Sequence, residues 1–195
     1  MTAASSKRLT FEEYVAIEEQ SEERHEFYAG ELFAMAGGTP EHAAVCAAVT
    51  HALVAQLVAP CRTFSEALRV RTPSGKVVYP DALVICGGVL RDPSDRNTVT
   101  NPTLVIEVLS ESTEAYDRGK KFEHYRSCPS LVEYVLVASR GAPAIERFVK
   151  TNGVWTIDTP ASSGQTLSLA SAGVTLTIDS IYRGLVGEDG AILEL

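Results

Sequence analysis

The sequence predicts a mixed α/β fold of the α+β type, in which a central sheet is flanked by helices. A length of 195 residues with 45% hydrophobic and 22% charged residues suits one compact domain. One long apolar helical pattern precedes several apolar extended runs. A strand, a helix and a further strand over residues 104–138 indicate a crossover with parallel pairing. We therefore expect a single domain over residues 1–195, with its core at about residues 40–140.

The N-terminal part predicts a short helix followed by a hairpin. Thr10 and Glu13 have the spacing of a capping box, so a helix is expected to begin there. Residues 24–37 contain two extended pieces around Tyr28-Ala29-Gly30, a pattern typical of a hairpin.

A longer helix is predicted from Pro40 to about Val58, ended by Pro60. His42 and His51 lie on opposite sides of it, about 180° apart, and cannot bind one metal ion together. A histidine metal site built on this helix is therefore excluded.

The middle of the chain predicts the core sheet. Extended runs are expected at residues 62–71, 77–86 and 103–109, with a functional or mobile loop at residues 87–102. A helix is expected from about Tyr116 to Ser127, before Pro129, and an apolar strand at residues 133–138. Residues 144–181 are expected to add short structural strands.

Charge and cysteine content exclude several classes of protein. With 17 basic and 25 acidic residues the net charge is −8, so any contact with nucleic acid must be local. No signal peptide and no apolar run of about 18 residues is present, which argues against secretion and against a membrane span. No C-x-x-C pair exists, so we expect reduced, mostly buried thiols and a cytoplasmic location. The cysteines are Cys46, Cys61, Cys86 and Cys128.

Two lone acids in apolar strands are the strongest functional signal. Asp81 precedes Ala82-Leu83-Val84-Ile85, and Glu107 lies inside residues 104–109. Burial of an ionised carboxylate without a partner costs about several kcal/mol of folding free energy. Each acid therefore needs a bound cation, a paired side chain or a proton. With no histidine or cysteine expected nearby, oxygen ligands favour Mg²⁺ or Mn²⁺ over Zn²⁺. The alternative is a structural role, in which each acid pairs with an arginine or caps a turn.

A cation can come from the segment that follows the Glu107 strand. Asp117, Lys121 and His124 have the spacing of one helix face. The Lys121 ammonium could stabilise negative charge that develops in a transition state. An ordinary exposed ion pair between Asp117 and Lys121 explains the same spacing.

These residues resemble the Uma-two family of restriction endonucleases, within the PD-(D/E)xK nuclease superfamily. The most specific part runs from residues 101–113 through residues 134–137, and residues 25–32 and His42 also match the family pattern. The shorter motifs are Pro80-Asp81, Glu107-x-Leu109, residues 117–122 and Tyr125.

The resemblance implies a restriction-endonuclease-like fold and hydrolysis of DNA phosphodiester bonds. Its four-stranded mixed core sheet would carry an extra N-terminal hairpin and C-terminal strands. Asp81 and Glu107 would be the ligands of Mg²⁺ or Mn²⁺. The superfamily places a lysine two residues after the second acid, where this chain has Leu109. The family's replacement maps to Lys121, with Lys120 as a weaker candidate.

Further residues are auxiliary candidates. Glu31 could add a third carboxylate, although an exposed hairpin acid is the simpler interpretation. His42 could orient a water or a phosphate, or it could be a core histidine. Asp117 and Lys120 complete the auxiliary set. Glu66, Arg69 and Arg71 alternate on one predicted strand and are expected to form a surface ladder, or the two arginines to contact phosphate.

The leading hypothesis is a Mg²⁺-dependent DNA endonuclease of restriction or repair type, acting as a homodimer because both strands of a duplex must be cut. A catalytically inactive module for binding or assembly, with the same fold, is the alternative, and the missing strand lysine favours it. A glycosidase with paired carboxylates would need an aromatic sugar cleft, and the chain is only 7% aromatic.

Overall fold

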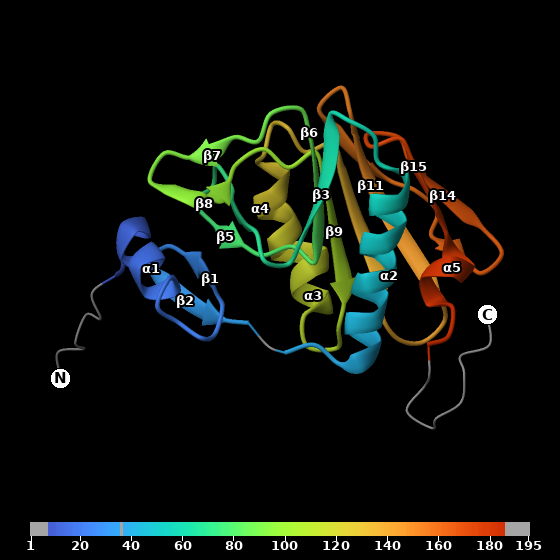
Figure 1. Ribbon diagram of the computed structural model, residues 1–195, viewed down its shortest axis with the longest axis horizontal. Helices are drawn as coiled ribbons and strands as arrows, with labels where there is room; N and C mark the ends of the chain where they lie inside the picture. The colour runs from blue at the N-terminus through green and yellow to red at the C-terminus, as the bar shows by residue number, and fades with distance from the viewer. Residues whose placement is uncertain (1–7, 36, 186–195) are drawn as a thin grey trace.

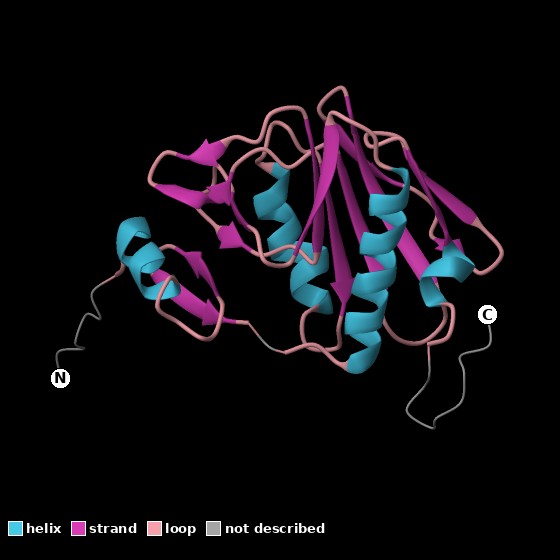
Figure 2. Cartoon of the chain, viewed as in Figure 1, coloured by secondary structure: helices cyan, strands magenta, loops and turns pink. Residues whose placement is uncertain are grey.

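A computed structural model of the chain describes residues 8–35 and 37–185 (Figures 1 and 2). None of the described helices is long and apolar enough to cross a membrane. The helical segments are α1 (Phe11–Glu18), α2 (Pro40–Gln56), α3 (Glu114–Tyr116), the π-helical η1 (Asp117–Lys121), α4 (Phe122–Arg126) and α5 (Ile178–Tyr182). The strands are β1 (His25–Tyr28), β2 (Glu31–Ala34), β3 (Cys61–Ser65), β4 (Arg69–Arg71), β5 (Val77–Val78), β6 (Ala82–Cys86), β7 (Arg91–Asp92), β8 (Asp95–Val99), β9 (Leu104–Leu109), β10 (Glu133–Ala138), β11 (Ala144–Thr151), β12 (Val154–Ile157), β13 (Ala161–Ser162), β14 (Thr166–Leu169) and β15 (Val174–Thr177).

The largest sheet has seven strands in the order β12-β11-β10-β9-β6-β3, with β13 paired to β11. Strand β6 is antiparallel to both β3 and β9, whereas β9 and β10 are parallel. The helical segments α3, η1 and α4 form the crossover between β9 and β10. The predicted mixed core of four strands, β3-β6-β9-β10, is therefore confirmed, and the chain extends it with β11, β12 and β13.

Both faces of this sheet are covered, which explains why β9 is apolar almost throughout. On one face Ile106 and Val108 pack in a core that includes Val49 of α2. On the other face Val105 and Leu109 pack in a core that includes residues of α4. Successive side chains of a strand point to opposite faces, so Glu107 lies on the α4 side, in line with Val105 and Leu109.

A second sheet, of six strands in the order β2-β1-β5-β4-β8-β7, accounts for three differences from the predicted elements. The run 62–71 divides into β3 and β4, and the run 77–86 divides into β5 and β6, so each run contributes to both sheets. The segment 87–102 contains the β7–β8 pair and is not a plain loop.

Arg69 and Arg71 lie within the second sheet and have structural partners. Arg69 pairs with Asp95 at 2.8 Å and Arg71 with Asp92 at 2.9 Å. Arg69 is buried, so the prediction of a surface ladder or a phosphate contact is wrong for it.

The N-terminal helix and hairpin are confirmed. Thr10 and Glu13 form both hydrogen bonds of the capping box at the start of α1. The hairpin turns at Ala29 (φ 51°) and Gly30 (φ 86°), and a Cβ at Gly30 would lie 2.5 Å from the Cβ of Arg8. Helix α1 and this hairpin lie at one end of the molecule (Figure 1). Phe27 packs against α1. Because side chains alternate along a strand, the face of the hairpin that carries Glu26 points away from α1.

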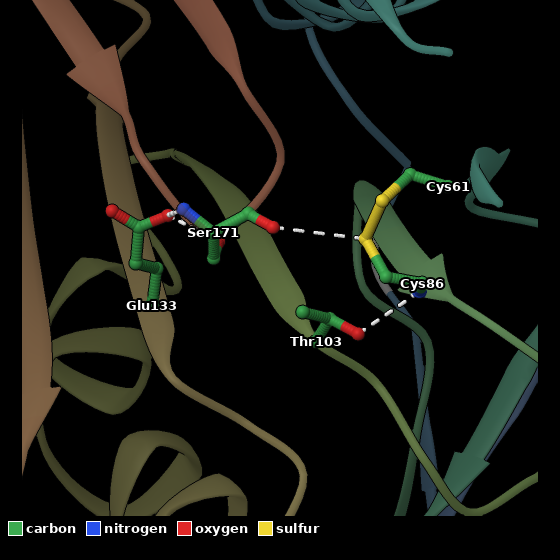
Figure 3. The surroundings of a disulfide bond; sticks show 5 residues. All are labelled: Cys61, Cys86, Thr103, Glu133 and Ser171. Atoms are coloured by element: carbon green, nitrogen blue, oxygen red, sulfur yellow. Dashed lines mark hydrogen bonds between the residues drawn. A yellow bond between two sulfur atoms is a disulfide. The ribbon is translucent and has the colours of Figure 1, made fainter. Parts of the chain in front are cut away.

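The prediction that all four cysteines are reduced is wrong for Cys61 and Cys86. Cys61 and Cys86 lie opposite each other in the β3–β6 register and form a disulfide, next to a hydrogen bond from the Cys86 N–H to Thr103 Oγ1 (Figure 3). Cys46 and Cys128 are free thiols. The cross-strand register could not be read from a separation of 25 residues. The expected cytoplasmic location rested partly on four reduced thiols and loses that support.

Removal of this disulfide is expected to destabilise the protein. A closed loop of this length contributes about 2–4 kcal/mol, mainly by restricting the unfolded chain. The double substitution Cys61→Ser with Cys86→Ser should lower the free energy of unfolding by that amount, as measured by urea denaturation. A reductant should lower the stability of the wild type and leave the double variant unchanged. Titration of four thiols in the unfolded, unreduced wild type would contradict the disulfide.

Candidate active site

Asp81 and Glu107 are brought together by the register of β6 and β9. Ala82 pairs with Ile106 and Leu83 with Val105 in this antiparallel pair. Continuing the register by one residue places Asp81 opposite Glu107, on the same face of the sheet. The Val108 N–H donates a hydrogen bond of 2.7 Å to Asp81 Oδ2. The two lone acids of the sequence therefore meet at one place.

Lys121 reaches Glu107 from the π-helical segment η1. Its Nζ lies 2.9 Å from Glu107 Oε2, 3.3 Å from Asp117 Oδ1 and 3.8 Å from Glu26 Oε1. The exposed fraction of Lys121 is 6%, so this is not the ordinary surface ion pair that the Asp117–Lys121 spacing allowed. π-Helical turns inside α-helices are frequent at functional sites. Lys120 is exposed, and no ion pair joins it to any residue of the described ranges.

Glu26 is the third carboxylate of the site, and sequence reasoning missed it. Glu31 was the predicted candidate, but it is exposed at the end of the hairpin and does not line the site. Glu26 is buried, and Lys76 Nζ lies 2.7 Å from its Oε2. Tyr116 donates a 2.6 Å hydrogen bond to the same oxygen. The available signal was the alternation in β1, in which Glu26 points away from the side where Phe27 packs on α1.

The electrostatics of the cluster follow from burial and crowding. Burial raises the pKa of Glu107 well above its ordinary value, and Lys121 lowers it only in part. Burial also raises the pKa of Asp117. Burial disfavours charge on Lys121, but the carboxylates of Glu107, Asp117 and Glu26 outweigh it and raise its pKa well above the usual range. Lys121 is therefore an ammonium that several acids hold in place.

His42 and Cys46 lie beside Asp81, on the first turns of α2. His42 Nε2 is 3.5 Å from Asp81 Oδ2, and Cys46 Sγ is 3.5 Å from His42 Nδ1. The hydrogen bond to Asp81 raises the pKa of His42. One ligand atom from each of the three residues lies within 4.8 Å of the others, so the group could hold a metal ion. The exclusion of a histidine metal site on this helix is wrong, because it considered only His42 with His51.

One cavity of about 630 Å³ joins these groups. Its polar lining includes all three residues proposed as catalytic from the sequence and three of the four auxiliary ones, with Glu31 as the exception. His124, predicted on the same helix face as Lys121, also lines the cavity. The polar lining from sequence candidates is Asp81, Glu107, Lys121, His42, Asp117, Lys120 and His124.

Comparison with known proteins identifies the relatives of this chain. The profile of the family described as "Uma2: Putative restriction endonuclease" matches residues 11–179. The chain belongs to the Uma2 family. A relative from Synechocystis sp., named an uncharacterized protein, is 35% identical over 188 residues, which cover 94% of this chain and 96% of the relative. A second uncharacterized protein of that organism is 34% identical over 139 residues, covering 70% and 78%.

A solved structure shares the fold of this Uma2 chain. It is the crystal structure of "a putative nuclease belonging to DUF820" from Anabaena variabilis, with a TM-score of 0.68 and 17% identity, covering 89% of this chain and 97% of that one. The predicted family and the restriction-endonuclease-like α+β fold are confirmed. Membership of Uma2 supports a nuclease as the class of enzyme.

The Uma2 site has ligands that suit a cation. Within the described residues, Glu107 Oε1 and the Tyr125 hydroxyl are both buried without a hydrogen bond of ordinary geometry, and the two groups interact with each other. The opposing Asp81 carboxylate raises the pKa of Glu107 further, so the two acids repel each other. A divalent cation bound by both would relieve this repulsion. Carboxylate oxygens select a hard ion such as Mg²⁺ or Mn²⁺, whereas His42 and Cys46 favour softer metals.

Proposed function

We propose that this protein is a metal-dependent endonuclease that hydrolyses DNA phosphodiester bonds. The observation that supports this proposal most is the meeting of Asp81, Glu107 and Lys121 in one cavity, with Lys121 Nζ 2.9 Å from Glu107 Oε2. Two carboxylates beside one ammonium suit phosphodiester hydrolysis, in which negative charge grows at the phosphate.

Asp81 and Glu107 would hold Mg²⁺ or Mn²⁺, which would polarise the scissile phosphate and lower the pKa of a bound water. Lys121 would contact the phosphate and neutralise developing charge, replacing the lysine that the strand lacks at Leu109. Glu26 and Asp117 would keep the Lys121 side chain in place, since both carboxylates lie within 3.8 Å of its Nζ. His42 would orient Asp81 from the side of α2.

The proposal includes a twofold homodimer, because two sites are needed to cut both strands of a duplex. The alternative is an inactive module for binding or assembly. The crowding of the Asp81 and Glu107 carboxylates favours the nuclease over this alternative, since two acids that repel each other gain stability from a shared cation.

The substitution Asp81→Asn tests the proposal. The wild type should cut DNA oligonucleotides or plasmid DNA in the presence of Mg²⁺ or Mn²⁺. This cleavage should stop when EDTA is added. Asp81→Asn keeps the shape of the side chain but removes a charged ligand, so cleavage should fall by about 10²-fold or more. Gel electrophoresis of the products and calorimetric titration with Mn²⁺ measure both effects.

The matched control is Glu31→Gln, an acid of the hairpin that lies outside the cavity. It should cleave DNA and bind Mn²⁺ as the wild type does. The inactive alternative predicts no cleavage by the wild type in either metal. Wild-type cleavage by Asp81→Asn would remove Asp81 from its proposed role.

A further inference from the structure

The cavity has an exposed apolar rim that hydrolysis alone does not explain. Tyr28, Phe33 and Met35 are 38%, 44% and 36% exposed, and all three line the cavity from the β1–β2 hairpin and the residue that follows it. Exposed apolar side chains gathered beside a polar site typically mark a ligand-binding surface.

The register of the hairpin explains why these side chains gather there. Phe33 pairs with Glu26, and Tyr28 lies two residues after Glu26, so the three share one face. The opposite face carries Phe27, which packs on α1. The same alternation that places Glu26 beside Lys121 therefore places two aromatic rings at the mouth of the cavity.

Both rings are held by neighbours and keep exposed surface. Lys76 Nζ lies 4.7 Å from the centre of the Phe33 ring. The Tyr28 ring meets His124 edge-on, with ring centres 4.6 Å apart. His124 is in turn hydrogen-bonded to Ser74 at 2.8 Å. Rings fixed in this way are suited to stack on a flat ligand, because little side-chain freedom remains to be lost.

The depth of the charged groups distinguishes between forms of DNA. Glu107 is 1% exposed and Lys121 is 6% exposed, so these two groups lie at the floor of the cavity, whereas Asp81 is partly exposed beside them. The backbone of a stacked duplex is part of a stiff rod and cannot enter such a cavity without deformation. A single strand is flexible and can lower one phosphate to the floor while its bases spread over the rim.

We propose that Tyr28 and Phe33 form a stacking platform for unpaired nucleobases, so that this site acts on single-stranded DNA or on a single-stranded segment of a larger DNA. Aromatic side chains beside positive charges are the usual means of holding single strands. Lys120, which is exposed at the same cavity, supplies positive charge for an adjoining phosphate. This inference rests on the proposed function and specifies its substrate, and it does not require the homodimer, because a single strand is cut at one site.

Binding of a fluorescein-labelled thymidine oligonucleotide of about 12 nucleotides tests the platform. Fluorescence anisotropy is measured in Ca²⁺, which neutralises carboxylates with looser coordination geometry than Mg²⁺. The single strand should bind at least about tenfold more tightly than a duplex of the same length. Tyr28→Ala and Phe33→Ala should each weaken its binding by about 5- to 150-fold, whereas Tyr28→Phe should bind as the wild type does.

The matched control is Val154→Ala, which truncates a 63% exposed apolar side chain on β12, outside the cavity lining. It should leave binding unchanged, and circular dichroism should show that all variants are folded. Equal or tighter binding of the duplex, or unchanged binding by both alanine variants, would overturn the inference.

Cleavage assays separate this inference from the proposed function. Tight single-strand binding that depends on Tyr28, with no cleavage in Mg²⁺ or Mn²⁺, would support the platform and refute the endonuclease. Cleavage of duplex DNA at a rate unchanged by Tyr28→Ala would support the endonuclease and refute the platform.

Discussion

Lys121→Met should both slow cleavage strongly and destabilise the fold. The substitution keeps the length of the side chain and removes a buried ammonium that faces Glu107, Asp117 and Glu26. Breaking a buried ion pair by removing one partner costs about 3–5 kcal/mol, because the remaining charges have no compensation. For a chain of this size the melting temperature should fall by about 6–20 °C. Cleavage should fall by about 10²- to 10³-fold in protein that is still folded at the assay temperature.

The neighbouring Lys120→Met is the matched control, since Lys120 is exposed and a surface substitution usually changes stability by less than about 0.5 kcal/mol. Thermal unfolding in EDTA compares the two variants directly. If Lys121→Met has the same melting temperature as the wild type, Lys121 does not interact with the three carboxylates as the structure places them. Adding Glu107→Gln to Lys121→Met should restore part of the lost stability, because one uncompensated carboxylate disappears.

Glu107→Gln should separate activity from stability. Glutamine keeps the shape of the side chain, and Lys121 retains Asp117 and Glu26 as partners. Burial and the Asp81 and Asp117 carboxylates raise the pKa of Glu107, so a neutral group at this position relieves repulsion in metal-free protein. We expect the melting temperature in EDTA to equal or exceed that of the wild type, while cleavage falls by about 10²- to 10³-fold.

Calorimetric titration with Mn²⁺ completes this comparison. Glu107→Gln should bind the ion more weakly than the wild type, and Mn²⁺ should raise the melting temperature of the wild type more than that of the variant. A variant that melts well below the wild type in EDTA would assign Glu107 a structural role instead.

The parts of the site that sequence could predict are those governed by local rules. Asp81 and Glu107 stood out because an acid in an apolar strand requires compensation, and the crossover between β9 and β10 followed from the order of the elements. Lys121 was favoured over Lys120 by family resemblance, whereas the choice in the structure comes from η1, which buries one and exposes the other.

The parts that sequence could not predict depend on contacts between distant elements. Glu26 and Glu31 share one face of the hairpin, and only the docking of the hairpin decides which acid enters the cavity. The Cys61–Cys86 pair required the β3–β6 register, and the group of His42, Cys46 and Asp81 required the start of α2 to lie beside β6. The division of two extended runs between two sheets likewise depends on tertiary packing.

Through Glu26, the β1–β2 hairpin contributes directly to the charges around Lys121. The Glu26 side chain pairs with Lys76 and lies near Lys121, yet it belongs to the six-stranded sheet, whereas Glu107 belongs to the seven-stranded sheet. Opening of the hairpin away from the rest of the protein would withdraw an anion from two buried lysines at once. Hydrogen exchange at the β1 amides and loss of activity should therefore follow the same local unfolding equilibrium.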